Sequence, residues 1–327
     1  MPTRRRALVV LAVLAVLAVA SMGVSLAVGS LSLGPGEVLA ALFGDDAGMG
    51  AEVVRNLRLP RTLGAFACGG LLALAGALMQ VLLRNPLADP YVLGISGGAA
   101  VGALAAMLGG LALAFVNLGA FTGAFLATLL VFGLAHGDSS WTRTRLLLTG
   151  VIVAAGCGAV VALILSIAPE HQLHGMLYWL MGDCGQVTDA RPALALLVVA
   201  LLAALPVARE LNLLARGEVL AASLGIVVPR LKRMVYVLAS LCTAAAVTTA
   251  GSIGFIGLVV PHLVRLAVGN DQRLLLPAAA LGGGALLVFA DTLARTVVAP
   301  TQLPVGVLTA LLGVPVFLFL LGRERPR

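Results

Sequence analysis

The chain has 327 residues, of which 61% are hydrophobic and only 11% charged, and its 21 basic and 14 acidic residues give a net charge of +7. Soluble domains carry about a quarter charged residues, so this composition excludes an ordinary soluble fold and predicts an integral membrane protein. The basic excess does not indicate a nucleic-acid partner, because the basic residues are scattered between apolar segments and form no single patch.

The apolar segments are typical of membrane helices. Residues 7–20 are apolar at every position, whereas a barrel strand alternates apolar and polar residues. About 20 apolar residues in a helix cross a hydrocarbon core of about 30 Å. We therefore predict an all-α integral membrane fold of ten transmembrane helices in a single domain, over residues 7–29, 62–82, 91–108, 113–135, 146–167, 191–208, 231–250, 252–269, 274–294 and 303–322.

The first span follows three arginines at positions 4–6. A cleaved signal peptide is the alternative, but the apolar run is longer than a typical signal core and favours a retained helix. The polar stretch 30–60 after it contains a short amphipathic segment at 36–43.

The distribution of basic residues predicts the orientation. If both termini are cytoplasmic and ten spans alternate, most basic residues fall on cytoplasmic segments, as the positive-inside rule expects. The outer segments keep only Arg55, Arg58, Arg61, Arg191 and Arg295. The cluster at 55–61 departs from the rule and is a candidate for binding an acidic partner.

Nothing in the sequence provides a source of energy. Ionisable residues, which proton- or sodium-coupled carriers need at membrane depth, are almost absent from the predicted spans. The only lysine, Lys232, lies in PRLKRM, so the nucleotide-binding pattern G-x-x-x-x-G-K-[ST] is missing. We therefore expect no ATPase site and no enzymatic activity in this chain, and a separate subunit that supplies the energy.

Metal and catalytic sites are not expected either. The cysteines (Cys68, Cys157, Cys184 and Cys242) have no metal-ligand spacing, and the four histidines are dispersed without an H-E-x-x-H pattern. His171 and His174 lie three residues apart in the predicted outer loop 168–175. A weak metal site or haem contact there stays open beside an ordinary loop.

Four sequence blocks resemble the FecCD-type permeases, which import ferric siderophores, haem or cobalamin with an ABC ATPase. They are residues 58–99, beginning RLPRTLGAF; 211–226, LNLLARGEVLAASLGI; 251–277, beginning GSIGFIGLVVPH; and ADTLAR at 290–295 followed by 303–321. The resemblance implies ten helices per subunit, a second copy of the chain, two ATPase subunits that bind ATP and Mg, and a periplasmic substrate-binding protein. It also implies a bacterial inner-membrane location.

The resemblance also assigns the outer arginines a role. Arg58 and Arg61 of RLPR and Arg295 of ADTLAR match arginines that receive acidic side chains of the binding protein, and Arg55 just ahead of the motif is a further candidate. Charge pairs at a wet rim steer docking and set orientation. A simple cap on the second span is the alternative for Arg61.

The cytoplasmic stretch 209–230 corresponds to the family's coupling segment. Its short apolar side chains are expected to enter a groove on the ATPase, with glycines at the turns, although an amphipathic loop helix at the membrane surface is the alternative. The candidate residues are Leu211, Asn212, Leu213, Leu214, Arg216, Gly217, Glu218, Ala221, Ala222, Leu224 and Gly225.

The resemblance also implies residues of the translocation path. Asn85 and Leu87 would narrow it near the cytoplasm, and Thr142–Thr144 would form a second gate. Arg143 departs from the small polar residue expected there and fits a solvated positive-inside charge equally well. Gly150, Gly156 and Gly158 would line the path from the fifth span, with helix packing as the alternative.

The sequence therefore predicts the permease subunit of a binding-protein-dependent ABC importer that works by alternating access. We expect an iron chelate as cargo, haem or a ferric siderophore, with cobalamin as the alternative within the same family. A passive channel or membrane scaffold is the alternative from another class.

Overall fold

The computed structural model describes residues 4–29, 31, 33–44, 48–135 and 143–323, and these contain helices but no strand. The helices are α1 Arg4–Ala27, α2 Pro35–Phe43, α3 Met49–Val53, the π-helix η1 Val54–Arg58, α4 Leu59–Leu83, the 3₁₀ helix η2 Pro90–Leu93, α5 Ile95–Leu108, α6 Leu113–Ala135, α7 Arg143–Ile167, α8 Glu170–Met181, the 3₁₀ helix η3 Cys184–Gln186, α9 Arg191–Ala204, α10 Ala208–Arg216, α11 Glu218–Ser223, α12 Val228–Ala250, α13 Ile256–Val268, α14 Gln272–Thr296 and α15 Val305–Arg323.

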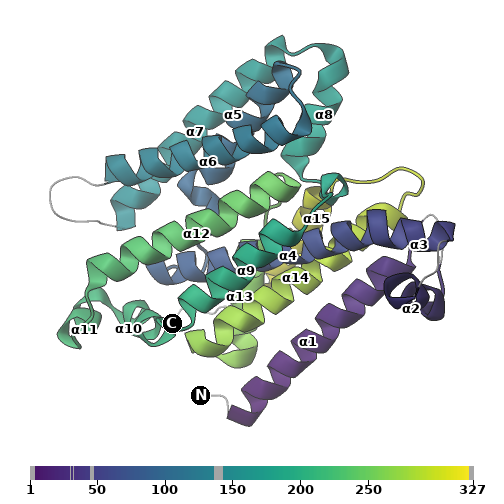
Figure 1. Ribbon diagram of the computed structural model, residues 1–327. Helices are drawn as coiled ribbons and strands as arrows, with labels where there is room; N and C mark the ends of the chain where they lie inside the picture. The colour runs from purple at the N-terminus through teal and green to yellow at the C-terminus, as the bar shows by residue number, and fades with distance from the viewer. Residues whose placement is uncertain (1–3, 30, 32, 45–47, 136–142, 324–327) are drawn as a thin grey trace.

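The long helices form layers (Figure 1). Helices α5, α6, α7 and α8 pack together on one side, and α12 connects them to a central group of α4, α9, α13 and α14, with α1 packed on α14 at the far side. The Tyr236 hydroxyl of α12 donates a hydrogen bond of 2.9 Å to the Thr128 carbonyl oxygen of α6, which joins the two groups.

Helix α4 is the centre of the fold. In the apolar segment that contains it, 94% of residues are buried, whereas the corresponding segments of α1 and α7 are 11% buried. All three segments are strongly apolar, so their composition alone does not predict which of them is buried. A helix that is apolar all round and buried lies inside a bundle, while one that stays exposed in the single chain faces lipid or another protein.

Small residues allow the central helices to approach closely. A Cβ atom on Gly69 of α4 would overlap the carbonyl oxygen of Gly283 in α14, and one on Gly283 would overlap the carbonyl oxygen of Gly69. Such mutual contact of backbones is the packing that small residues permit in membrane helices. It fixes α4 against α14 along their length, so that polar groups at both ends of the two helices are brought together.

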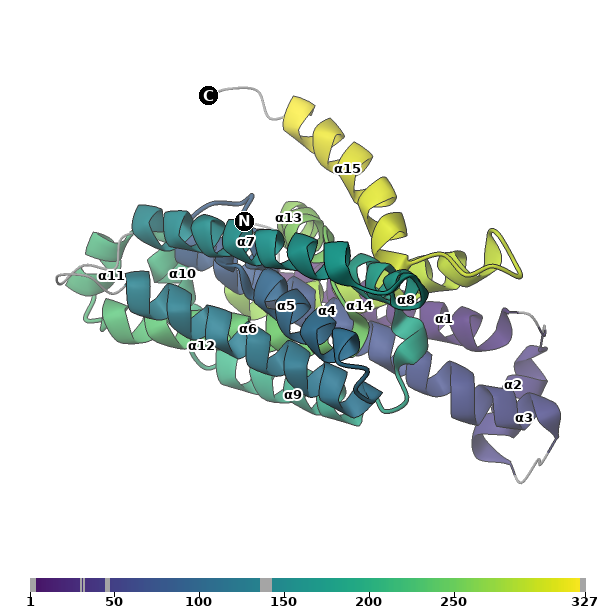
Figure 2. The ribbon, with the colours of Figure 1, turned by 90° about the horizontal axis from the view of Figure 1, so that it is seen from above.

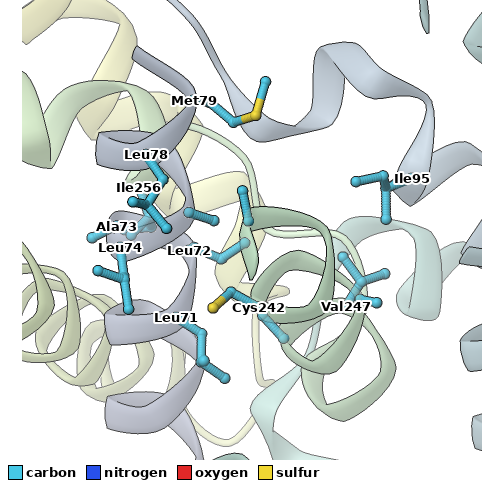
Figure 3. Close-up of a cluster of buried hydrophobic side chains, with 14 of the residues drawn as sticks. Leu71, Leu72, Ala73, Leu74, Leu78, Met79, Ile95, Cys242, Val247 and Ile256 are labelled. Atoms are coloured by element: carbon cyan, nitrogen blue, oxygen red, sulfur yellow. The ribbon is translucent and has the colours of Figure 1, made fainter. Parts of the chain in front are cut away.

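The core lies where α4 meets α12 and α13. Figure 3 shows Leu71 and Leu72 of α4 on the side of the helix that faces Cys242 of α12, and Leu74 on the other side. All these side chains are at most 1% exposed.

The helical prediction is confirmed. Among the described residues, six helices are long and apolar enough to cross a membrane, and α9 with α10 makes a seventh if this pair, bent by 68°, is one span. Three shorter apolar helices, in α5, α13 and α15, occupy the remaining predicted positions. The count of ten spans and the side on which the termini lie stay predictions.

Two segments differ from the sequence-based expectation. The predicted loop 168–190 contains α8, in which the apolar side chains of Leu173, Met176, Leu177 and Leu180 recur at helical spacing and Met176 is fully buried. The predicted span 191–208 ends earlier, at Ala204, because Pro206 cannot continue a helix.

Two boundaries are sharper than the sequence indicated. Residues 251–255 separate α12 from α13, and Gly251 and Phe255 both have a φ of 70°. The boundary between the seventh and eighth predicted spans therefore lies at these residues. The third span begins with η2 and starts its α-helix only at Ile95, after Gly94 at a φ of 74°.

Helix α15 stands apart from the other helices. In Figure 2 it leaves the bundle beside α14 and extends away from the layers. Leu311, Leu318 and Phe319 are each about 60% exposed, at 64%, 63% and 59%.

Candidate functional site

Polar residues gather at the two opposite ends of α4 and α14. Arg58 and Arg61 lie where α4 begins and Arg295 lies in the last turn of α14, so the antiparallel packing of these helices brings the three arginines to one end, the arginine end. Arg84 follows the last turn of α4 and Asp271 caps the first turn of α14, at the other end. That end also carries α10 and α11, and is called the coupling end below.

Arg61 forms a buried ion pair with Asp291 of α14. Its Nε lies 3.1 and 2.9 Å from the two carboxylate oxygens and its Nη2 lies 2.9 Å from Oδ1, while Nη1 donates to Gln302 Oε1 at 2.7 Å. The Asp291 side chain is fully buried. Charge-assisted forked hydrogen bonds of this kind are among the stronger polar interactions in proteins, so Asp291 fixes the direction of the Arg61 guanidinium.

Asp291 also holds Arg295, four residues later on the same helix. Arg295 Nε lies 3.4 Å from Asp291 Oδ2. The Arg295 Nη2 group donates to the backbone carbonyl and the hydroxyl of Ser25 at 3.0 and 2.9 Å. The Ser25 hydroxyl in turn lies 2.8 Å from that of Thr62. One carboxylate therefore joins α1, α4 and α14 through two arginines.

Arg58 closes the C-terminal end of α1. Its side chain donates to the carbonyl oxygens of Leu26 at 2.7 Å and Ala27 at 3.0 Å, and also to that of Leu31. The last carbonyls of a helix lack partners within it and carry partial negative charge, so a cation there is favourable. Arg55 does the same for α2, donating to the carbonyls of Ala41 and Gly44, but it stays exposed.

The structure thus brings Arg58, Arg61 and Arg295 together, as the prediction of a common docking site requires, and it gives each of them a partner inside the chain. Arg58 is 5% and Arg61 is 9% exposed. The alternative of a local structural role therefore has direct geometric support for all three. The sequence interpretation overlooked Asp291 as the common partner of Arg61 and Arg295, although its spacing of four from Arg295 on a helix indicated one of these contacts.

The arginine end keeps an excess of positive charge. Among the residues that the structure describes, the one further carboxylate in an ion pair with the three guanidinium groups is that of Asp183, 3.9 Å from Arg61 Nη2. Two carboxylates against three guanidinium groups leave one positive charge. An acidic group from outside would be attracted to this end.

At the coupling end, several predicted contact residues face inward. Leu211 is fully buried and Leu214 is 1% exposed, because the amphipathic α10 turns its apolar face onto α4 and α14. Ala221 of α11 is also fully buried, where α11 packs against α10 and α12. The prediction that these three side chains enter a groove on another protein is therefore wrong: they anchor the segment to its own chain.

A different set of apolar side chains is exposed there. Leu224 is 58% exposed, as predicted, and it is joined by three residues that the sequence interpretation did not select, Val219 at 86%, Leu220 at 43% and Val227 at 65%. Val219 lies two positions before the buried Ala221 and therefore on the opposite face of this short helix, a placement that only the structure shows. These four residues form the exposed apolar patch of the coupling end.

Polar contacts hold the segment rigidly. Asn212 donates to Asp271 Oδ1 at 2.9 Å and accepts a hydrogen bond from the Gln272 N–H at 2.9 Å. Glu218 forms an ion pair with the buried Lys232, at 3.2 Å. A displacement of α10 and α11 would therefore be transmitted directly to α14 and α12.

The predicted turns and the remaining coupling residues are placed as follows. Gly217 has a φ of 152° and Gly225 a φ of 83°, so both glycines form the turns that were predicted. Arg216 and Ala222 are exposed and Leu213 is partly buried.

The predicted gate residues are only partly described. Asn85 and Leu87 are exposed at the coupling end, where the Asn85 Oδ1 atom accepts a hydrogen bond of 2.9 Å from the Leu87 N–H. Thr144 is exposed at the start of α7. Thr142 lies outside the described residues, and of Arg143 the structure describes only the backbone.

The three glycines of α7 divide into two kinds. A Cβ on Gly150 would overlap the carbonyl oxygen of Val92, so Gly150 serves close packing against η2. Gly156 and Gly158 face open space on the exposed side of the helix. Only these two are placed where they could line a path.

The histidine pair lies on α8. His171 and His174 are exposed, and the His174 ring lies 4.5 Å from that of Tyr178. Within the described part of the chain, no group of three or more histidine, cysteine or acidic side chains is arranged to hold a metal ion.

Apolar helices of membrane-crossing length, a basic cluster at one end and an exposed apolar patch at the other define a multi-pass membrane protein of the transport class. The model of the FecCD transport family matches residues 11–323. The chain belongs to this family.

Relatives agree with that assignment. A hemin transport system permease protein of Yersinia pestis is 46% identical over 281 residues, which cover 83% of each chain. A cobalamin import system permease protein of Halobacterium salinarum is 45% identical over 276 residues, covering 84% of this chain and 74% of the relative. A solved structure of a metal-chelate type ABC transporter in an inward-facing conformation matches with a TM-score of 0.84 and 30% identity, over 97% of this chain and 99% of the other.

Proposed function

We propose that this chain is the membrane permease of an ABC importer in the bacterial inner membrane, which receives an iron chelate from a periplasmic binding protein and is driven by two separate ATPase subunits. The exposed apolar patch of the coupling end carries the proposal. Val219, Leu220, Leu224 and Val227 lie on a segment clamped to α12 and α14. Such a patch on a rigid base is suited to a small contact with a motor protein, because exposed apolar clusters mark interaction sites.

The mechanism follows from the clamp. ATP binding closes the ATPase dimer and moves α10 and α11. The Glu218–Lys232 ion pair and the Asn212–Asp271 hydrogen bond pass this movement to α12 and α14, which end near the arginine end. The opening of the path then switches from one side of the membrane to the other, without a nucleotide site in this chain.

A second copy of the chain would complete the path. The exposed side of α7 carries Gly156 and Gly158 among apolar residues such as Ile152 and Leu163, which are 63% and 60% exposed. A face of small residues offers a smooth wall to a large ligand that must pass without tight binding. Cross-linking of cysteines introduced at positions 156 and 163 would test whether two copies meet across this face.

The binding protein would dock at the arginine end. The net positive charge of this end supports this, and the neighbouring Arg55 is exposed. Charge reversal at Arg55 should weaken the stimulation of ATP hydrolysis by the binding protein in liposomes. Basal ATP hydrolysis of the complex should stay unchanged, because the coupling end is untouched; undiminished stimulation would contradict the docking role.

The cargo is proposed from the relatives. The hemin and metal-chelate permeases named above support an iron chelate, and the cobalamin permease keeps cobalamin as the alternative. Thermal stabilisation of the cognate binding protein by haem, ferric siderophores and cobalamin would decide between them. Uptake that needs neither ATP nor a binding protein would instead indicate a passive channel.

A further inference from the structure

A cavity of 640 Å³ lies beside the coupling segment, between the end of α4, the end of α13, α10 and the start of α14. Its size falls within the range of small-molecule sites, about 300–1,000 Å³. The lining residues are Gln80, Val81, Arg84, Pro86, Asn212, Ala215, Arg216, Arg265, Val268, Asn270, Asp271, Gln272 and Leu274.

The cavity is strongly basic. Three arginines line it, Arg84, Arg216 and Arg265, and none of them forms an ion pair with a described residue. The one carboxylate in the lining, Asp271, is engaged as the cap of α14 and as the partner of Asn212. Concentrated positive charge without counter-charge attracts an anion.

The cavity wall holds one of the arginines in place. Arg265 Nη2 donates a hydrogen bond of 2.6 Å to Gln80 Oε1, and both side chains line the cavity. The direction of this guanidinium group is therefore fixed before an anion binds.

The three arginines indicate the class of ligand. Guanidinium groups bind phosphate oxygens in forked pairs. We propose that this cavity binds a phosphate group, from inorganic phosphate or from the headgroup of an anionic lipid.

Two arms of one experiment distinguish the sources, both with the full chain purified in detergent. In the first, thermal unfolding is followed while inorganic phosphate replaces chloride at constant ionic strength. In the second, native mass spectrometry records retention of phosphatidylglycerol against phosphatidylcholine. A rise in melting temperature with phosphate alone identifies the free ion, whereas selective retention of phosphatidylglycerol identifies the lipid.

Variants locate the site. Arg216→Gln, Arg84→Gln and Arg265→Gln should each weaken binding of the anion by about tenfold, since hydrogen bonds to a charged group contribute about 1.5–3 kcal/mol. Arg209→Gln, an exposed arginine on the same helix that does not line the cavity, is the matched control and should bind as the unaltered chain does. Arg84 and Arg216 are exposed, so their replacement leaves the core intact.

Three results would overturn the proposal. The first is equal weakening by Arg209→Gln, which would mean that net charge alone attracts the anion. The second is binding in the unaltered chain that none of the three cavity variants reduces. The third is an absence of phosphate and phosphatidylglycerol binding while Arg84→Glu or Arg216→Glu blocks assembly with the ATPase, which would make an acidic side chain of the partner the occupant.

Discussion

The two polar ends of the molecule use charge in opposite ways. At the arginine end, Arg58, Arg61 and Arg295 are turned inward and satisfied by Asp291 and by the carbonyls of α1. At the coupling end, Arg84 and Arg216 stay exposed around a cavity, while apolar side chains face outward. The comparison teaches that in this chain burial of a charge serves to join helices, and exposure of charge and apolar surface serves to meet other molecules.

The largest effect is expected at Asp291. Replacing Asp291 by Asn leaves two guanidinium groups at the arginine end without their charge partner, and breaking a buried pair in this way costs about 3–5 kcal/mol. Thermal unfolding in detergent should show a much lower melting temperature. Asp189→Asn, which removes an exposed carboxylate, is the control. If Asp291→Asn matched the unaltered chain in stability, the joining role of the arginine end would be refuted.

The second effect separates the two faces of the coupling segment. Leu214→Ala opens a cavity behind a residue that is 1% exposed and should destabilise the chain by about 2–5 kcal/mol. Val219→Ala, at 86% exposure, should change stability by less than about 0.5 kcal/mol. It should nevertheless reduce ATP-driven uptake in reconstituted complexes. Equal stability losses in the two variants would show that the faces are not distinct.

A smaller effect is expected at the clamp. Lys232→Gln removes the partner of Glu218, whose side chain is 33% exposed and therefore partly solvated. The loss of stability should be only about 1 kcal/mol. Uptake should fall more than the stability loss explains, while basal ATP hydrolysis persists, because movement of α11 is no longer passed to α12. Lys232→Arg keeps the charge and is expected to restore uptake.

The smallest effect concerns Asp189, between η3 and α9. Hydrogen bonds from the Arg191 side chain and backbone lower the pKa of the Asp189 carboxyl. A lowered pKa contributes stability above the unfolded-state value of about 3.9 and loses it as the pH falls through the folded-state value. The melting temperatures of the unaltered chain and of Asp189→Asn should therefore differ slightly at neutral pH and converge below about pH 4. A difference that grew on acidification would contradict this.

Much of the molecule could be predicted from its residues one segment at a time. The helices lie close to the predicted spans, and the match of 113–135 to α6 is complete, because twenty consecutive apolar residues have no other way to satisfy their backbone in lipid. The turns at Gly217 and Gly225 and the arginine cluster were also readable, since each depends on local sequence.

The segments that were predicted wrongly are those whose residues fit a buried and an exposed position equally well. The segment of α8 was predicted as a loop, although Leu173, Met176, Leu177 and Leu180 recur at helical spacing and Met176 is buried in the core. For α10 and α11, the prediction selected buried residues and missed exposed ones. Leucine is equally apolar on either face of a helix, and only the face that packs against α14 decides which leucines are buried.

The sequence by itself determined that this chain is a helical membrane protein, because apolar length is a property of contiguous residues, and the absence of the G-x-x-x-x-G-K-[ST] pattern was readable in the same way. Only the tertiary structure decided that Asp291 unites Arg61 and Arg295, and that Arg58 closes α1. These contacts join residues as much as 230 positions apart. They form because Gly69 and Gly283 allow the backbones of α4 and α14 to come into contact. No local sequence pattern predicts which two helices approach so closely.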